Sequence, residues 1–426
     1  MIGIDFGTTN SAVARLTSAG PQLAEFSLLG EPTHSFRSVL YFSIEERVST
    51  REPGVFSGPK AIEQYLEEDA GGRYVQSLKS LLPSRTFEST QVLGTVYTLE
   101  DMIAEILRGL RTASRSSLGE LGGKAVVGRP VHFVGAKEPS DEDHALARLR
   151  EAFSRSGFDD ITFAFEPVAA AAGYAATLTR DETLLVADFG GGTSDFCILQ
   201  VGPQSAKMPQ SERVLATDGV GLAGERFDAR IVRERVAPRL GRGTQYKAMG
   251  GTLFDIPDWL YVKLSDWHEL SFLRAERPLK VLRDVASGAV EQKAVRAFQA
   301  LVEHNMGYFL YDQVEASKRR LSDAASTELR FDDAGVNISE VIDRADFEAW
   351  IADDLDQIVL ALDRCLGKAG KRPEHIDRVF LTGGTAFVPA VREIFEDTFG
   401  LAKISGGGEL TSVATGLATL AGTTHD

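Results

Sequence analysis

Two glycine-rich stretches, Asp5–Thr9 and Asp188–Asp195, share one order of residue types, and this pairing constrains the fold of the chain more than any other feature. In each, an apolar run is followed by an acidic residue, a glycine-rich turn, hydroxyl residues and a second apolar run. Apolar runs bounded by turn residues are typical of β-strands, so each stretch predicts a strand–turn–strand hairpin. The repetition predicts two similar lobes, each offering a hairpin loop to one ligand between them.

The residue types in these loops indicate phosphate and a metal. Glycine lets the backbone approach an anion closely and turn its amides toward it, and the hydroxyls of Thr8, Thr9 and Thr193 add donors. A carboxylate would repel bare phosphate, so Asp5 and Asp188 make sense with Mg²⁺ between them, held through its water shell. One such loop alone would be explained better as an ordinary hairpin turn. Two matched loops favour the ligand site.

Composition narrows the class of protein. A chain of 426 residues predicts two or more domains, and its net charge of −15 argues against general nucleic-acid binding, which needs a basic surface. Cys197 and Cys365 have no metal-type spacing, so we expect neither a zinc site nor a disulfide framework. The first residues enter a strand without a basic region or a long apolar stretch. We therefore expect a soluble cytoplasmic protein without a membrane span.

Helical patterns place several further residues. Tyr74–Leu82 is predicted as a helical patch that carries Lys79, which on its own is most simply a solvated helix residue. The alanine-rich segment Val168–Thr177 is predicted as one helix, either a plain packing element or a crossing helix between lobes that slide. The glycine-rich turn Asp218–Asp228 is either a long loop or a third wall of the ligand site.

The segment Val290–Leu321 is predicted to be strongly helical. Near its end, Glu315, Lys318, Arg319 and Ser322 follow the spacing i, i+3, i+4, i+7 and therefore share one helix face. A solvated charged stripe is the ordinary explanation for such a pattern.

Five motifs together resemble the actin-like ATPase superfamily, specifically the nucleotide-binding domain of the 70-kilodalton heat-shock chaperones (the DnaK type). The similarity is to the divergent YegD-like members. Each motif alone is weak, but all five occur in the family's order and span nearly the whole chain. They are the first phosphate motif Ile4–Ser11, the connecting helix Glu166–Ala171, the second phosphate motif Asp188–Asp195, the adenosine motif Gly383–Thr385 and the second connecting helix Val413–Gly416.

The resemblance implies an α/β fold in which two actin-like (ribonuclease-H-like) lobes flank a central nucleotide cleft, each lobe with an inserted subdomain. Lobe I is expected to comprise residues 1–177 and 410–426, with an insertion at about 31–100. Lobe II is expected to comprise residues 178–409, with an insertion at about 219–310. The family's interdomain linker and peptide-binding β-domain have no counterpart in these residues, so we expect no client clamping of the DnaK type.

The resemblance also implies ATP or ADP with Mg²⁺ as ligand, and roles for individual residues. Lys79 would reach the γ-phosphate and the attacking water, and Glu166 would position the water shell of a metal on the side of Asp5 and Asp188. Asp195 would orient or deprotonate the attacking water, with Thr193 beside it as a further catalytic residue. The residues expected to bind the nucleotide are Gly7, Thr8, Thr9, Asn10, Gly190, Gly191, Gly192, Thr193, Gly224, Glu225, Glu315, Lys318, Arg319, Ser322, Gly383, Gly384, Thr385 and Phe387.

Two departures from the family pattern concern the nucleotide. Phe387 stands where the chaperones usually have an arginine that stacks on adenine, and a phenyl ring can still stack but carries no charge. Leu410 and Thr411 stand where acidic residues usually precede the second connecting helix.

The main hypothesis is therefore a Mg–ATP-binding switch with slow hydrolysis, read in its ATP state by an unknown protein partner, with no nucleic acid and no membrane involved and with a monomer as the working assumption. One alternative is a nucleotide-binding regulatory module with negligible hydrolysis, and another is a filament-forming relative of bacterial actin. The Glu315–Ser322 face favours the chaperone type over the filament type. Sugar kinases share the first loop but normally carry a different second loop.

Overall fold

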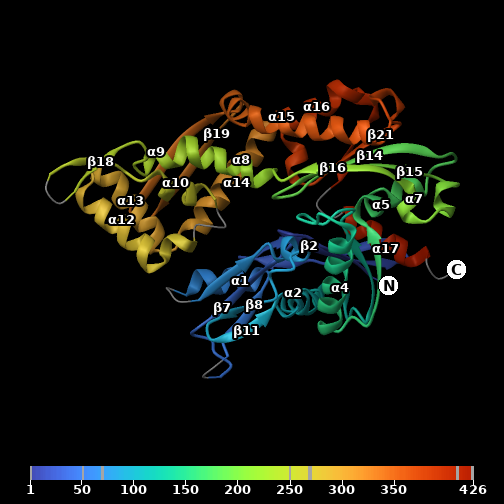
Figure 1. Cartoon of the computed structure of the whole chain (residues 1–426), viewed down its shortest axis with the longest axis horizontal. Coiled ribbons are helices and arrows are strands. Elements are labelled where there is room, and N and C mark those ends of the chain that lie inside the picture. The colour runs from blue at the N-terminus through green and yellow to red at the C-terminus, as the bar shows by residue number, and fades with distance from the viewer. Residues whose placement is uncertain are drawn as a thin grey trace. The chain divides into compact units, whose positions relative to one another are not determined.

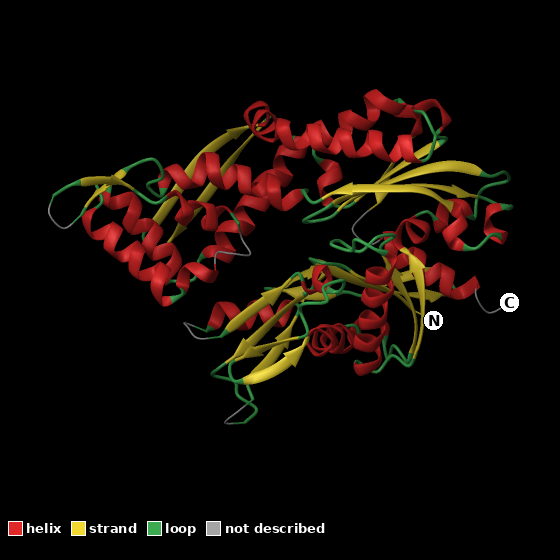
Figure 2. Ribbon diagram, in the orientation of Figure 1, coloured by secondary structure: helices red, strands yellow, loops and turns green. Residues whose placement is uncertain are grey.

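The computed structural model describes residues 2–49, 52–68, 72–248, 251–266, 271–408 and 412–423. They form a mixed α/β protein (Figures 1 and 2). The chain divides into two compact units. Unit 1 comprises residues 1–221, 358–386 and 394–426, and unit 2 comprises residues 222–357 and 387–393.

Unit 1 contains two sheets with the same topology. In the first, β1 is parallel to β12 and antiparallel to β2, and the strand order is β13-β12-β1-β2-β3 with β6 beside β2. Its strands are β1 (Ile2–Phe6), β2 (Asn10–Thr17), β3 (Gly20–Leu23), β6 (Phe36–Arg37), β12 (Lys124–Arg129) and β13 (Asp160–Phe165). In the second, β14 is parallel to β21 and antiparallel to β15, in the order β16-β15-β14-β21-β22. Its strands are β14 (Glu182–Phe189), β15 (Ser194–Val201), β16 (Val214–Val220), β21 (Arg378–Thr382) and β22 (Ile404–Gly408).

In each sheet, then, a three-stranded antiparallel meander is followed by two parallel strands. This shared order turns the sequence repeat into a structural one. It confirms the predicted α/β class with a duplicated ribonuclease-H-like sheet.

Different helices cover the two faces of the first sheet. On one face, α2 (Leu99–Ala113) and α4 (Pro139–Arg155) bury apolar side chains against residues of β1 such as Ile4 and Phe6. On the other face, the alanines Ala12 and Ala14 of β2 pack against Ala414 and Ala418 of α17 (Ser412–Thr423). The sheet is therefore buried on both sides, as its near-continuous apolar strands require.

The close approach of α17 depends on glycine. A Cβ at Gly3 of β1 would overlap the backbone of Ala418, and a Cβ at Gly416 would overlap the carbonyl of Ala169 in α5. Any side chain at either position would push the elements apart. The predicted helix Val168–Thr177 is in fact two short helices, α5 (Glu166–Ala170) and α6 (Ala172–Ala175), separated by a turn residue at Ala171.

The remaining elements of unit 1 are smaller. They are β4 (Phe26–Leu28), β5 (Glu31–Thr33), β7 (Val39–Ser43), β8 (Gly54–Ser57), α1 (Pro59–Glu67), β9 (Arg73–Gln76), β10 (Ser89–Val92), β11 (Thr95–Thr98), α3 (Arg115–Leu118) and α7 (Gln210–Arg213). The predicted helical patch at Tyr74–Leu82 is wrong in its first half, because Tyr74 and Val75 belong to β9, which pairs with β7. Only Leu78–Leu81 is helical, as a 3₁₀-turn.

Unit 2 is mainly helical, with two hairpins. Its elements are α8 (Gly224–Ile231), a π-helical turn (Val232–Val236), α9 (Ala237–Arg239), β17 (Gln245–Lys247), β18 (Leu253–Asp255), α10 (Asp258–Ser265), α12 (Glu276–Gly288), α13 (Gln292–Glu303), α14 (Gly307–Asp323), β19 (Ser326–Asp333) and β20 (Val336–Asp343). The chain then continues through α15 (Arg344–Lys368) and α16 (Pro389–Phe399). The predicted long helix Val290–Leu321 is interrupted, since Asn305 between α13 and α14 adopts the left-handed conformation with φ of 56°.

Among the helices that the structure describes, none combines the length and the apolar character that crossing a membrane requires.

Candidate functional site

Both predicted phosphate loops are tight turns of antiparallel hairpins. The first connects β1 to β2, and a Cβ at Gly7 would overlap the carbonyl of Asn10. The second connects β14 to β15, where the amide of Gly190 donates to the carbonyl of Thr193 at 2.9 Å. Thr8, Thr9, Gly191 and Gly192 lie in these turns, partly exposed to solvent. The strand–turn–strand prediction is confirmed at both places.

Lys79 and Glu166 meet although 87 positions separate them in the chain. The Lys79 Nζ donates to Glu166 Oε1 at 2.8 Å, and the two side chains are only 9% and 15% exposed. Burial alone would lower the pKa of Lys79, but the charges of Glu166 and Asp5 outweigh it and raise that pKa. Lys79 is therefore held in its ammonium form.

The aspartates that end β1 and β14 lie in the field of this pair. Burial, followed by the charge of Glu166, raises the pKa of Asp5 to about 8, although Lys79 opposes the shift. Burial also raises the pKa of Asp188, even though Thr382 Oγ1 donates to its Oδ1 at 2.7 Å. Each carboxylate would be easier to ionise if further positive charge were present.

Asp195 faces Asp188 across the second hairpin. Thr193 Oγ1 donates to its Oδ2 at 2.7 Å. Solvent reaches the Asp195 side chain, yet the surrounding protein raises its pKa to about 6, and the charges of Asp188 and Glu166 add to the effect. The structure thus brings Asp5, Lys79, Glu166, Asp188 and Asp195 within electrostatic reach of one another.

This group of side chains fits a divalent cation. Three aspartates and Glu166 act on one another, while Lys79 is the cation that lowers the pKa of each aspartate. The excess of carboxylate is the donor chemistry that Mg²⁺ prefers, usually with several waters retained in its shell. Within the described residues, no three His, Cys, Asp or Glu side chains are grouped for direct metal ligation.

The predicted adenosine face lies on α14 in unit 2. The Lys318 Nζ donates to the carbonyl of Gly224 at 3.0 Å and to Asp228 Oδ2 at 2.7 Å. Burial raises the pKa of Asp228 to about 6, the charge of Lys318 opposes the shift, and the charges of Glu315 and Glu225 add to it. The four polar residues predicted on one face do share one helix, with Arg319 exposed and Ser322 half-buried.

The glycine-glycine motif follows β21 directly. Gly383 has φ of +82°, and a Cβ there would overlap the carbonyl of Phe189, so the turn requires glycine. Gly384 begins a 3₁₀-turn, in which Thr385 is buried. Phe387 exposes 57% of its surface. Leu410 and Thr411, the second departure from the family pattern, lie outside the described residues.

Three site residues were not singled out individually from the sequence. Asp228 ends the glycine-rich segment predicted as a possible third wall of the ligand site, but its pairing with Lys318 joins positions 90 residues apart. Thr382 is the last residue of β21, and a hydroxyl before the Gly-Gly motif was its signal. Gly128 is a third, because a Cβ there would lie 3.0 Å from Glu166 Cγ, and no local pattern announced it.

The duplicated sheet, with an aspartate at the end of β1 and of β14, defines a protein of the actin-like ATPase superfamily. A family model described as Hsp70 protein matches residues 74–239 and 293–425, which is more than half of the chain. The chain therefore belongs to the Hsp70 family. The matched ranges include Lys79, Glu166 and the second hairpin loop, whereas Asp5 and the first loop precede them.

Proposed function

We propose that this chain is a chaperone-type nucleotide-binding domain, of the divergent YegD-like kind, that binds Mg–ATP, hydrolyses it slowly and acts as a conformational switch. The observation that carries the proposal is the set of carboxylates that the two repeated hairpins and Glu166 bring around Lys79, whose Nζ lies 2.8 Å from Glu166 Oε1. Membership of the Hsp70 family supports ATP as the nucleotide.

The binding roles follow from charge. Mg²⁺ would supply the positive charge that the carboxylates of Asp5 and Asp188 lack, and so neutralise the charge that develops on the phosphates. Lys79, kept protonated by its neighbours, donates hydrogen bonds to anionic oxygens. The backbone amides of the two hairpin turns add donors that need no side-chain ordering. Catalysis of this kind is mainly positioning and charge neutralisation.

Asp195 is the proposed proton acceptor for the attacking water. Its pKa of about 6 lies near neutral pH, which suits a group that must be ionised at rest and still accept a proton. Thr193 fixes one of its oxygens and leaves the other free of that bond. On the adenosine side, we propose that the α14 face contacts the nucleoside and that the exposed ring of Phe387 offers a stacking surface.

The decisive experiment is Asp195→Asn, a nearly isosteric change that removes the base. We expect ATP turnover to fall by about 10²–10⁴-fold while ATP still binds. Asp160→Asn is the matched control, because Asp160 is an exposed aspartate on β13 that pairs with Lys124 on β12. The turnover of this variant should equal that of the parent. An Asp195→Asn protein that hydrolyses ATP at the parental rate would remove Asp195 from this role.

One observation favours a second candidate, a nucleotide-binding regulatory module with negligible hydrolysis. The exposed, uncharged Phe387 replaces the adenine-stacking arginine of the family, which would change how the base is held. This candidate gains support if the parent protein binds ATP tightly and releases no phosphate over hours. In either case we propose a cytoplasmic setting, a monomer, and a protein partner that reads the ATP-bound state. The absence of client clamping stays a prediction.

A further inference from the structure

The backbone that carries Lys79 is unusual. It enters through Ser77, which adopts the left-handed conformation with φ of 58° and ψ of 26°. A non-glycine residue in this region is sterically strained and persists only where its surroundings impose it. The next four residues, Leu78–Leu81, form a single 3₁₀-turn.

Local hydrogen bonds hold this turn only weakly. The amides of Ser80, Leu82 and Ser84 each donate to a carbonyl three residues earlier in the chain, at 3.2, 3.2 and 3.0 Å, and the Ser80 hydroxyl adds one bond to the Ser77 carbonyl at 2.7 Å. Such short turns have poorer hydrogen-bond geometry than α-helices and do not persist alone. Leu78 and Leu82 are buried in the core and anchor the apolar side of the turn. Apolar contacts are not directional, so they do not fix the orientation of the turn's polar side, which carries Lys79. The position of Lys79 therefore depends on contacts from outside the turn.

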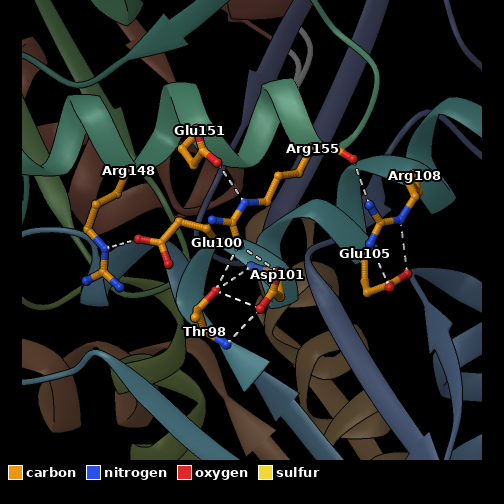
Figure 3. A network of polar contacts seen from close by, with 8 residues as sticks. All are labelled: Thr98, Glu100, Asp101, Glu105, Arg108, Arg148, Glu151 and Arg155. Carbon is orange, nitrogen blue, oxygen red and sulfur yellow. Dashed lines mark hydrogen bonds and ion pairs between the residues drawn. The ribbon is translucent and has the colours of Figure 1, made fainter. Parts of the chain in front are cut away.

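Arg148 of α4 supplies such a contact. Its Nη1 donates at 3.1 Å to the carbonyl of Ser84, three residues beyond the 3₁₀-turn Leu78–Leu81 that carries Lys79, which we call the Lys79 turn. Its Nε donates to Glu100 Oε1 on α2, as Figure 3 shows. Arg148 is buried, with 7% of its surface exposed, and a buried guanidinium is tolerated only when it is paired and hydrogen-bonded. It thus links α4, α2 and the exit of the turn.

Arg155, two turns further along α4, provides a contrast within the same pair of helices. It pairs with Glu151 on α4, with Asp101 on α2 and with Thr98, the residue that caps α2 (Figure 3), but none of these hydrogen bonds reaches the Lys79 turn. Both arginines connect α2 to α4. Only Arg148 extends the connection to residues 78–84.

We propose that Arg148, oriented by Glu100, is a positioning residue that fixes the Lys79 turn. The conformational part of this inference stands on the structure alone, and only its consequence for hydrolysis rests on the proposed function. Losing Arg148 would free the Ser84 carbonyl and let the turn relax away from the strained Ser77 conformation. Lys79 would then meet Glu166 and the phosphates in a broader range of positions.

The test is amide hydrogen exchange of the nucleotide-free protein, so that it needs no turnover. In Arg148→Met we expect the amides of Ser80, Leu82 and Ser84 to exchange at least about tenfold faster than in the parent. Arg155→Met is the matched control, because it breaks a link between α2 and α4 and should leave these three amides unchanged. Equal exchange in the two variants, or unchanged exchange in Arg148→Met, would overturn the inference.

Two more variants keep the test valid if Arg148→Met fails to fold, and they distinguish positioning from a general loss of structure. Glu100→Gln keeps the hydrogen-bonding shape but removes the charge that orients Arg148, so it should raise exchange of the same amides by a smaller factor. Arg148→Lys should restore protection in part, since an ammonium can reach one acceptor but not both. If exchange does not follow this order, the positioning role is wrong.

Turnover separates this inference from the proposed function. If the parent hydrolyses ATP, Arg148→Met should lower kcat about tenfold with a smaller change in KM, because the nucleotide contacts remain while Lys79 is misplaced. If the parent shows no hydrolysis but the exchange pattern holds, the proposed hydrolysis fails and the positioning of Lys79 stands.

Discussion

The carboxylates around Lys79 and those along α2 are the same residue types in opposite electrostatic surroundings. Around Lys79, burial and neighbouring carboxylates raise the pKa values of Asp5 and Asp195. Along α2, burial alone would also raise the pKa values of Glu100 and Asp101. There, hydrogen bonds from Arg148, Thr98 and Arg155 outweigh burial and lower those pKa values.

This difference separates a ligand site from a structural network. A carboxylate matched by an arginine has its charge balanced inside the protein, so the network on α2 and α4 is complete without any further group. The carboxylates at the two hairpins repel one another and would be stabilised by a bound cation. The direction of the pKa shift therefore marks which cluster is prepared for a ligand.

Among the tests that compare these two clusters, the largest expected effect comes from removing the Lys79 ammonium. Lys79→Met should lower ATP turnover by about 10²–10³-fold, since one fixed positive group aimed at the phosphates is lost. Lys124→Met, which removes an exposed lysine paired with Asp160, should leave turnover unchanged. Phosphate release measured at saturating Mg–ATP tests both variants, and equal rates in the two would break the proposed distinction between the clusters.

A smaller effect is the pH dependence of the nucleotide-free protein. Because the folded-state pKa of Asp5 is raised to about 8, its contribution to stability is complete below pH 4 and is lost as pH rises toward 8. The free energy of unfolding of the parent should therefore fall between pH 5 and pH 8.5. In Asp5→Asn this fall should be smaller by about 2–4 kcal/mol, as measured by urea unfolding without Mg²⁺.

The raised pKa of Asp5 also determines whether Mg–ATP affinity rises or falls with pH. Ionised Asp5 favours a cation, so Mg–ATP affinity should rise from pH 6 to pH 8, with protons released on binding. Calorimetry in buffers of different ionisation enthalpy would measure the release. A parent protein whose unfolding and binding are both flat across this range would contradict the assignment.

The smallest expected effect comes from a substitution in the arginine–carboxylate network of α2 and α4. Asp101 completes a capping box with Thr98 at the start of α2, so Asp101→Ala should lower the free energy of unfolding by about 1 kcal/mol at pH 7. The lowered pKa of Asp101 means that its contribution is present above pH 4 and is lost as pH falls further, opposite in sign to that of Asp5. Urea unfolding at pH 7 and pH 3 compares the two, and the loss should be smaller at pH 3.

The sequence predicts well what local patterns encode. Both hairpins, the charged face of α14 and the glycine turn at Gly383 follow from residue order within short windows. The residues that set the charge and the position of the site residues cannot be predicted from such short windows. Thr382, Asp228 and Arg148 act through contacts that span 90 or more residues, or, for Arg148, 48 and 64.

Tertiary pairing also explains the errors in secondary structure. The segment beginning at Tyr74 has an apolar pattern compatible with a helix, but it pairs with the edge of β7 and so forms the strand β9. Asn305 tolerates the left-handed conformation that ends α13, and so divides a pattern that looks continuous. Neither choice is visible in a window of one or two turns.

The packing of α17 against β1 has a consequence for how the chain folds during synthesis. Gly3 leaves the ribosome long before Ala418, against whose backbone it packs. One face of the first sheet therefore stays uncovered while the residues between them are synthesised. Contacts between such distant positions form slowly and leave apolar surface exposed meanwhile, so nascent chains of this protein should depend on assistance until α17 has been synthesised.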